Sequence, residues 1–287
     1  MIETLPESEI QASINQPAAY PTVKESWGAL GWFMLLALVL GFLSIPFLRF
    51  TTHAQSIIVT VVASDLAKAL IIVFLLWKIP AVRRQPIRLL ASREIPLVYL
   101  LLPLLVFAQM ALRTLVVFLH LPNWMSDSMQ KLNAFPGLSF FVICISAPIL
   151  EELLFRGLLL PGLLKNYSPR KAIVQSSLLF GIIHLNPAQV VSAFLLGLFL
   201  GWLYYRTHSL AACIVVHFLN NAVAWKALQN PKWQNVEDPI ALLPGGSTLL
   251  LMIVIAAVIF AGGTWLIWRA TQQSVAMRDA SIDSLEL

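Results

Sequence analysis

Eight apolar runs, each about as long as a membrane-spanning helix, make up most of this 287-residue chain. A helix needs roughly 20 predominantly apolar residues to cross the hydrocarbon core of a bilayer. The chain is 59% hydrophobic and 11% charged, whereas an average soluble domain carries about 25% charged residues. We therefore predict an all-α, polytopic transmembrane helical bundle of about eight spans. The runs are Gly28–Leu48, Ala54–Trp77, Ile95–Leu119, Phe135–Leu164, Lys171–Leu185, Ala188–Tyr205, Leu210–Ala227 and Thr248–Trp268.

These runs suggest a division of the chain into four parts. We predict a soluble N-terminal tail over 1–27 and N-terminal transmembrane helices over 28–134. A transmembrane core follows over 135–227, and residues 228–287 hold a loop, the last helix and a cytoplasmic tail. The fifth run is short for a full crossing, so we expect it to start inside the headgroup region or to cross part of the membrane.

Basic residues are concentrated in every second loop. Cytoplasmic loops of membrane proteins carry an excess of lysine and arginine, which predicts that both termini are cytoplasmic. Short loops and an acidic N-terminal tail favour a bacterial inner membrane. Basic residues mainly set orientation in a membrane protein, so the net charge of +5 says nothing about nucleic acid. The expected partner is the lipid bilayer, and no nucleic acid is expected. The richest loop holds Lys78, Arg83, Arg84, Arg88 and Arg93.

The fourth apolar run contains two adjacent carboxylates, Glu151 and Glu152, followed by Arg156. A charge at the bilayer centre costs at least roughly 2.5–3.5 kcal/mol, so these groups must be paired or used. Glu152 and Arg156 are four apart and share a helix face, whereas Glu151 is turned by about 100°. Two interpretations stay open: one structural pair beside a carboxylate held for chemistry, or a charge cluster that locks helices together.

Other polar residues lie at membrane depth. His184 ends the fifth run, and His217 and Asn221 point one way from the seventh because they are four apart. Asp65 and Lys68 are three apart and can pair across one turn. A further arginine, at position 113 near the outer end of the third run, is expected to snorkel toward the interface.

A carboxylate and two imidazoles in one layer support three chemistries. They can bind a divalent metal such as zinc, activate water with glutamate as general base, or relay protons in a transporter. Cys144 and Cys213 lie within apolar runs, which favours packing over a disulfide or metal ligation. Ser176 and Ser177 are expected to be helix-packing residues, so a covalent mechanism is disfavoured.

Three ordered motifs resemble those of the CAAX protease and bacteriocin-processing enzyme family, which includes CAAX prenyl endopeptidases and bacterial Abi proteins. The resemblance covers roughly 140–225 and implies an intramembrane endopeptidase whose helical core encloses a polar cavity. The motifs are Glu151-Glu152-x-x-x-Arg156, Phe180-x-x-x-His184 and His217-x-x-x-Asn221.

The resemblance also implies roles. Glu151 corresponds to the water-activating base, and His184 shares that water or a metal. His217 and Asn221 correspond to oxyanion donors or further ligands. The resemblance groups Glu152 with this catalytic set, in an orienting or structural role. Arg156 and Phe180 correspond to structural, orienting residues.

We therefore predict a metalloendopeptidase that hydrolyses membrane-associated proteins or peptides. Its expected cofactor is zinc or another divalent metal held by Glu151, His184 and His217, with a metal-free glutamate mechanism left open. A non-catalytic membrane scaffold or bacteriocin-immunity protein with the same fold is the alternative. A transporter is disfavoured because no internal repeat is visible.

Overall fold

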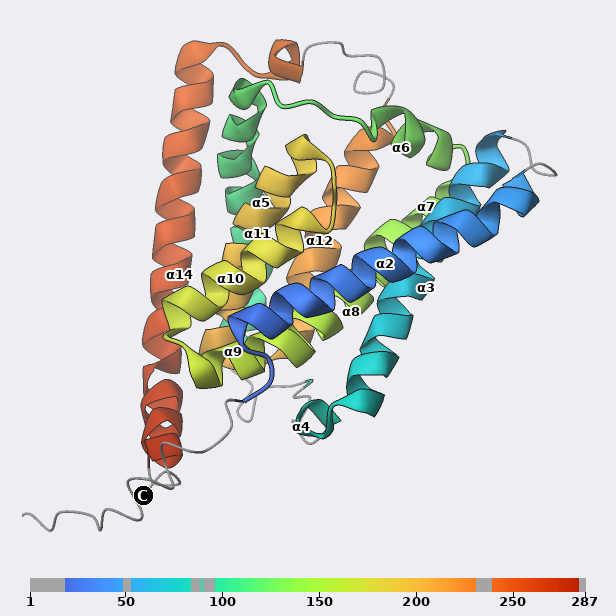
Figure 1. Ribbon diagram of the computed structural model, residues 1–287. Helices are drawn as coiled ribbons and strands as arrows, with labels where there is room; N and C mark the ends of the chain where they lie inside the picture. Colours follow the sequence, from blue (N-terminus) through green and yellow to red (C-terminus); the bar gives the residue numbers. More distant parts are fainter. Residues whose placement is uncertain (1–18, 49–52, 84–88, 90–95, 231–238, 284–287) are drawn as a thin grey trace, which may run out of the picture.

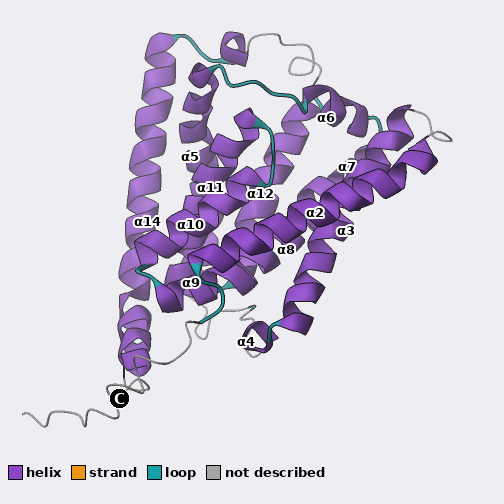
Figure 2. Ribbon diagram, in the orientation of Figure 1, coloured by secondary structure: helices purple, strands orange, loops and turns teal. Residues whose placement is uncertain are grey.

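The computed structural model describes residues 19–48, 53–83, 89, 96–230 and 239–283, and this part of the chain is built from helices joined by loops (Figures 1 and 2). This confirms the predicted all-α class. The α-helices are α2 (Val23–Leu48), α3 (His53–Lys78), α4 (Pro80–Arg83), α5 (Pro96–Arg113), α6 (Ser126–Leu132), α7 (Pro136–Phe140), α8 (Ala147–Glu152), α9 (Leu160–Asn166), α10 (Pro169–Ile182), α11 (Pro187–Thr207), α12 (Leu210–Leu228) and α14 (Gly246–Asp283).

Seven helical segments of the described chain are long and apolar enough to cross a membrane. They correspond to seven of the eight predicted runs, with bounds that agree within a few residues at most ends. The exceptions are α2, which begins earlier, and α14, which continues well beyond the predicted run. The remaining run, the fifth, forms α10, a helix of 14 residues, which agrees with the predicted incomplete crossing. The protein is therefore a multi-pass integral membrane protein.

Some predictions concern residues that the structure leaves out. Most of the predicted tail 1–27 lies outside the described residues, as do Arg84, Arg88 and Arg93 of the basic loop. The orientation of the termini, the four-part division and the polar cavity stay predictions.

The segment Pro136–Asn166 is one long span with an interrupted α-helical pattern. A π-helical stretch, Phe141–Ser146, precedes α8, and a second, Leu153–Leu159, follows it. Pro148 lies in the first turn of α8 and has no backbone N–H to donate, which breaks the regular hydrogen-bond ladder. The short α8, which carries both glutamates, is thus held between two π-helical stretches, a feature often found at functional sites.

Helices α10 and α11 form a hairpin in front of α12 (Figure 1). Small residues allow this close contact: a Cβ atom added at Gly197 would lie 3.1 Å from the Ser177 Cα atom. Both Ser176 and Ser177 are buried, as expected of packing residues. On the other side, α2 and α3 pack together, and α3 also contacts α8. The glutamates on α8 therefore face elements from distant parts of the sequence.

Candidate active site

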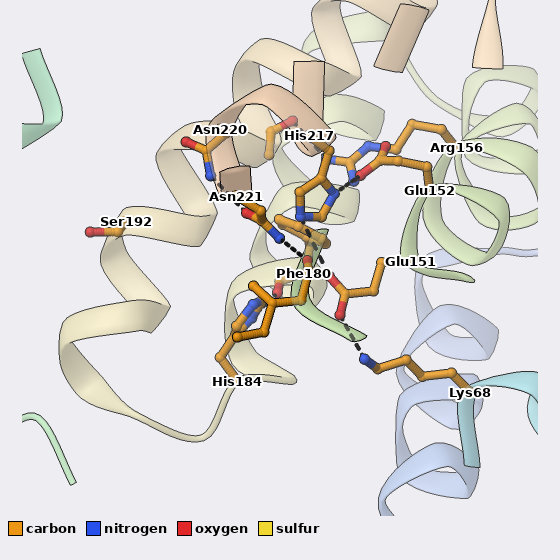
Figure 3. A network of polar contacts seen from close by, with 12 residues as sticks. Lys68, Glu151, Glu152, Arg156, Phe180, His184, Ser192, His217, Asn220 and Asn221 are labelled. Atoms are coloured by element: carbon orange, nitrogen blue, oxygen red, sulfur yellow. Dashed lines mark hydrogen bonds and ion pairs between the residues drawn. The ribbon is translucent and has the colours of Figure 1, made fainter. Parts of the chain in front are cut away.

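The two adjacent glutamates of α8 point to different partners (Figure 3). Glu151 has 5% of its surface exposed, and Glu152 is fully buried. Glu152 faces Arg156 and His217, whereas Glu151 faces Lys68. Buried carboxylates are costly unless they are paired and hydrogen-bonded, and each one here has its own cation.

Arg156 forms the predicted structural pair with Glu152. Its NH1 atom lies 2.9 Å from Glu152 Oε1, and its NH2 atom donates to the Gly197 carbonyl oxygen at 3.1 Å. The guanidinium also lies over the Phe180 ring, 4.5 Å from the centroid. Arg156 thus ties the glutamate helix to α11 and α10, and its orienting role stays a prediction.

His217 lies between the two glutamates. Its Nδ1 atom is 2.8 Å from Glu152 Oε1, and its Nε2 atom is 3.9 Å from Glu151 Oε2. An ionised carboxylate can only accept a hydrogen bond, so Nδ1 carries the proton that it donates to Glu152. In the neutral imidazole this leaves the Nε2 lone pair directed toward Glu151.

His184 follows α10 and is half-buried. Its Nδ1 atom donates to the Phe180 carbonyl oxygen at 3.0 Å, because that oxygen can only accept, and its Nε2 atom is again left open. The Phe180 ring lies between the two imidazoles, with centroid distances of 5.5 Å to His184 and 5.6 Å to His217. Phe180 therefore spaces the two histidines around Glu151, as Figure 3 shows.

Lys68, on α3, completes the cluster, and the predicted set of site residues did not include it. Its Nζ atom lies 2.8 Å from Glu151 Oε1 and 3.1 Å from Asp65 Oδ1. The sequence did predict the pairing of Asp65 with Lys68. The sequence did contain a signal that this pair belongs to a site: a lysine at membrane depth usually has a functional role.

Asn221 belongs to a second polar layer next to the histidines. Its amide nitrogen donates to the Ile143 carbonyl oxygen at 2.8 Å, in the first π-helical stretch, and its Oδ1 atom accepts from Asn220 at 2.9 Å. Asn220 in turn accepts hydrogen bonds from Gln109 and Arg113. The layer connects α5, α12 and the span that carries the glutamates.

The expectation that Arg113 snorkels to the interface is wrong. Its NH1 atom donates to the Ser192 carbonyl oxygen at 3.0 Å, and its NH2 atom donates to Asn220. Acceptors on α11 and α12 thus hold the guanidinium inside the bundle, where a charged group needs several hydrogen bonds to offset its burial.

The predicted metal ligands can be tested against this geometry. Within the described residues, no three side chains of histidine, cysteine, aspartate or glutamate form a group that could hold a metal ion. Glu151, one of the predicted ligands, has its Oε1 atom bound by the Lys68 ammonium group. The arrangement described here does not fit a three-ligand metal site, and the metal stays a prediction.

Together these features define a polytopic helical membrane protein with a buried glutamate–histidine cluster. Residues 133–223 match the family model for type II CAAX prenyl endopeptidase Rce1-like proteins. This confirms the resemblance predicted from the sequence over roughly a third of the chain. The matched segment contains every predicted site residue, whereas Lys68 lies outside it. Comparison with curated proteins and with solved structures found no match.

Proposed function

We propose that this protein is an intramembrane endopeptidase that hydrolyses membrane-associated proteins or peptides, with Glu151 as the base that activates water. One observation carries the proposal: Glu151 Oε2 and His217 Nε2 face each other at 3.9 Å inside a buried cluster. That distance is too long for a direct hydrogen bond. It is short enough for one water molecule to bond to both atoms.

The tautomers give such a water a defined orientation. Glu151 Oε2 and the unprotonated Nε2 of His217 are both acceptors, so the water donates one proton to each. Its oxygen lone pairs then point away from both groups, toward an approaching carbonyl carbon. Glu152 supports this arrangement because it accepts the Nδ1 proton of His217 and so fixes the tautomer.

The reaction follows from these positions. The water oxygen bonds to the carbonyl carbon of the scissile peptide while Glu151 takes the proton that the water loses. When the tetrahedral intermediate collapses, the carbon–nitrogen bond breaks and Glu151 returns that proton to the leaving amine. One water is added overall, and the enzyme returns to its starting state.

The remaining residues are assigned to the substrate. The Asn221 amide nitrogen has two protons, of which the Ile143 carbonyl oxygen accepts one. We assign the other to the oxyanion of the intermediate, which polar donors in a buried site stabilise strongly. His184, which contacts the same Phe180 ring as His217, is assigned to hold the scissile peptide.

The family name points to a substrate class. The matched model describes CAAX prenyl endopeptidases, so a peptide with a prenylated cysteine near its C-terminus is the first substrate to test. A lipidated or otherwise membrane-associated peptide suits a site formed by spanning helices, because the bilayer already concentrates it there.

The test compares purified wild-type protein with Glu151→Gln and His184→Ala. The probes are an internally quenched peptide ending in a farnesylated CAAX sequence and its unprenylated twin. Glu25→Gln is a matched exposed glutamate. His120→Ala is a close control for His184, because its Nδ1 atom also bonds a backbone carbonyl oxygen at 3.0 Å. We expect both site variants to lose cleavage and both controls to keep it.

Metal dependence is measured on the same samples. When bound, zinc would polarise the carbonyl and lower the pKa of its water, so cleavage would stop on chelation and return with zinc. Cleavage that survives chelation and is lost in Glu151→Gln supports the metal-free base. A Glu151→Gln variant that still cleaves refutes the proposed base. If the wild type cleaves neither probe nor a panel of membrane peptides, the scaffold or immunity alternative takes precedence.

A further inference from the structure

We propose that Lys68 is a positioning residue of this site: its ammonium group holds Glu151 Oε1, so that Glu151 Oε2 is the oxygen that takes the water proton. This inference rests on the proposed function. It assigns a positioning role to α3, which lies outside the segment that matches the family model.

The Lys68 ammonium group is buried and is held in one orientation by ion pairs. The residue is 8% exposed, and its Nζ atom contacts carboxylates from two sides, Asp65 on its own helix and Glu151 on α8. Lysine is almost never buried unless it is paired. Asp65 therefore acts as a second anchor that prevents the ammonium group from swinging away from Glu151.

The lysine makes the two oxygens of Glu151 unequal. Oε1 is bound at 2.8 Å by a charged donor, whereas Oε2 faces His217 Nε2. Without the ammonium group the carboxylate could turn to intermediate orientations in which neither oxygen lies opposite His217 Nε2. A displacement of about 1 Å at a reacting group can cost on the order of 10²-fold in rate.

The pairing of charges in the cluster also supports a role for Lys68. The two adjacent carboxylates are paired with two different cations, Glu152 with Arg156 and Glu151 with Lys68. Arg156 comes from the same span as the glutamates, whereas Lys68 comes from a helix that is 83 residues away in sequence from Glu151. The matched core thus supplies one of the two cations, and α3 supplies the other.

The kinetic test uses Lys68→Met, Lys68→Arg and Asp65→Asn, with Lys78→Met as the matched control. Lys78 ends the same helix, is exposed, and lies over the Trp77 ring rather than near the site. For Lys68→Met we expect kcat per folded molecule to fall about 10²-fold with KM unchanged, because Lys68 orients the base and does not bind substrate.

The conservative variants distinguish a role of Lys68 in positioning Glu151 from a role in folding alone. Lys68→Arg keeps a charged donor, so kcat should stay within about tenfold of wild type. Asp65→Asn keeps an acceptor for Lys68 but loses the charge, and kcat should fall roughly three- to tenfold. A purely structural role would lower the yield and melting temperature of Lys68→Met while the kcat of the folded fraction stayed at the wild-type value.

A second measurement needs no substrate. Dicyclohexylcarbodiimide enters membranes and activates buried carboxylates, and a neighbouring lysine amine then displaces the urea to form an amide. Mass spectrometry should find a side-chain amide (isopeptide) bond between Lys68 and Glu151 in the wild type and none in Lys68→Met.

Absence of that link in the wild type overturns the inference. So does a Lys68→Met protein with wild-type kcat, and in that case the proposed function stands if Glu151→Gln is inactive. A Glu151→Gln protein that still cleaves overturns the proposed function and this inference with it.

Discussion

Removing the Arg156 side chain should be among the most destabilising single changes in this protein. Arg156 is fully buried and makes three contacts: an ion pair with Glu152, a hydrogen bond to the Gly197 carbonyl oxygen, and a cation–π contact with Phe180. Arg156→Met fills a similar volume but leaves the Glu152 carboxylate buried with His217 as its remaining donor.

The expected loss of stability follows from the buried Glu152 carboxylate that would lose its cation. Breaking a buried ion pair by removing one partner costs about 3–5 kcal/mol, whereas removing both charges together is often nearly neutral. We therefore expect Arg156→Met to lower the free energy of unfolding by about 3–5 kcal/mol. The double variant Glu152→Gln/Arg156→Met should recover about half of that loss or more, because glutamine still accepts the His217 proton.

The two free cysteines provide the assay. Cys144 and Cys213 are both buried, so a thiol-reactive dye labels them as the detergent-solubilised protein unfolds. A loss of this size corresponds to a melting temperature that is lower by roughly 6–20 °C. Tryptophan emission, which is independent of the thiols, gives a second reading of the same transition.

Two results would refute this reasoning. An Arg156→Met protein that melts within about 2 °C of wild type would mean that Glu152 is not stranded when its cation is removed. A double variant no more stable than the single one would mean that the loss comes from packing against Phe180 rather than from the unpaired carboxylate.

Two further predictions concern contacts outside the glutamate cluster. Arg113→Leu should cost about 1.5–3 kcal/mol by the same dye assay and lower kcat, because Asn220 loses a charged donor; an unchanged melting temperature would indicate an arginine that reaches the interface after all. Gly162→Ala should cost about 1–3 kcal/mol, because its Cβ atom would overlap the Tyr20 carbonyl oxygen. Gly137→Ala, with nothing within 4 Å, is its control and should melt at or slightly above the wild-type temperature; equal losses in the two glycine variants would contradict this packing.

The spans could be predicted from the sequence because the bilayer imposes a simple rule. A spanning helix must satisfy its own backbone and expose apolar side chains, so length and hydropathy locate it. The run predicted as Leu210–Ala227 forms α12, Leu210–Leu228. The same rule does not report π-helical stretches, because the residues of Phe141–Ser146 are as apolar as those of a regular helix.

The local part of the site was also predictable. Glu152 and Arg156 are four residues apart, and helical geometry alone brings them together. The partner of Glu151 could not be predicted in this way, because Lys68 lies on another span and no local spacing relates the two residues. Arg113 shows the same limit: its place near a helix end favoured snorkelling, whereas its acceptors come from α11 and α12.

The two cations explain how adjacent carboxylates can be kept at this depth. Arg156 is bound to Glu152 and to the Gly197 carbonyl oxygen, and the cation that contacts Glu151 is Lys68. If Glu151 is to stay ionised and act as a base, a second cation must come from another helix, and α3 supplies it. A fragment restricted to the family-matched segment would leave Glu151 without that partner, so the proposed base needs α3 as well as the matched segment.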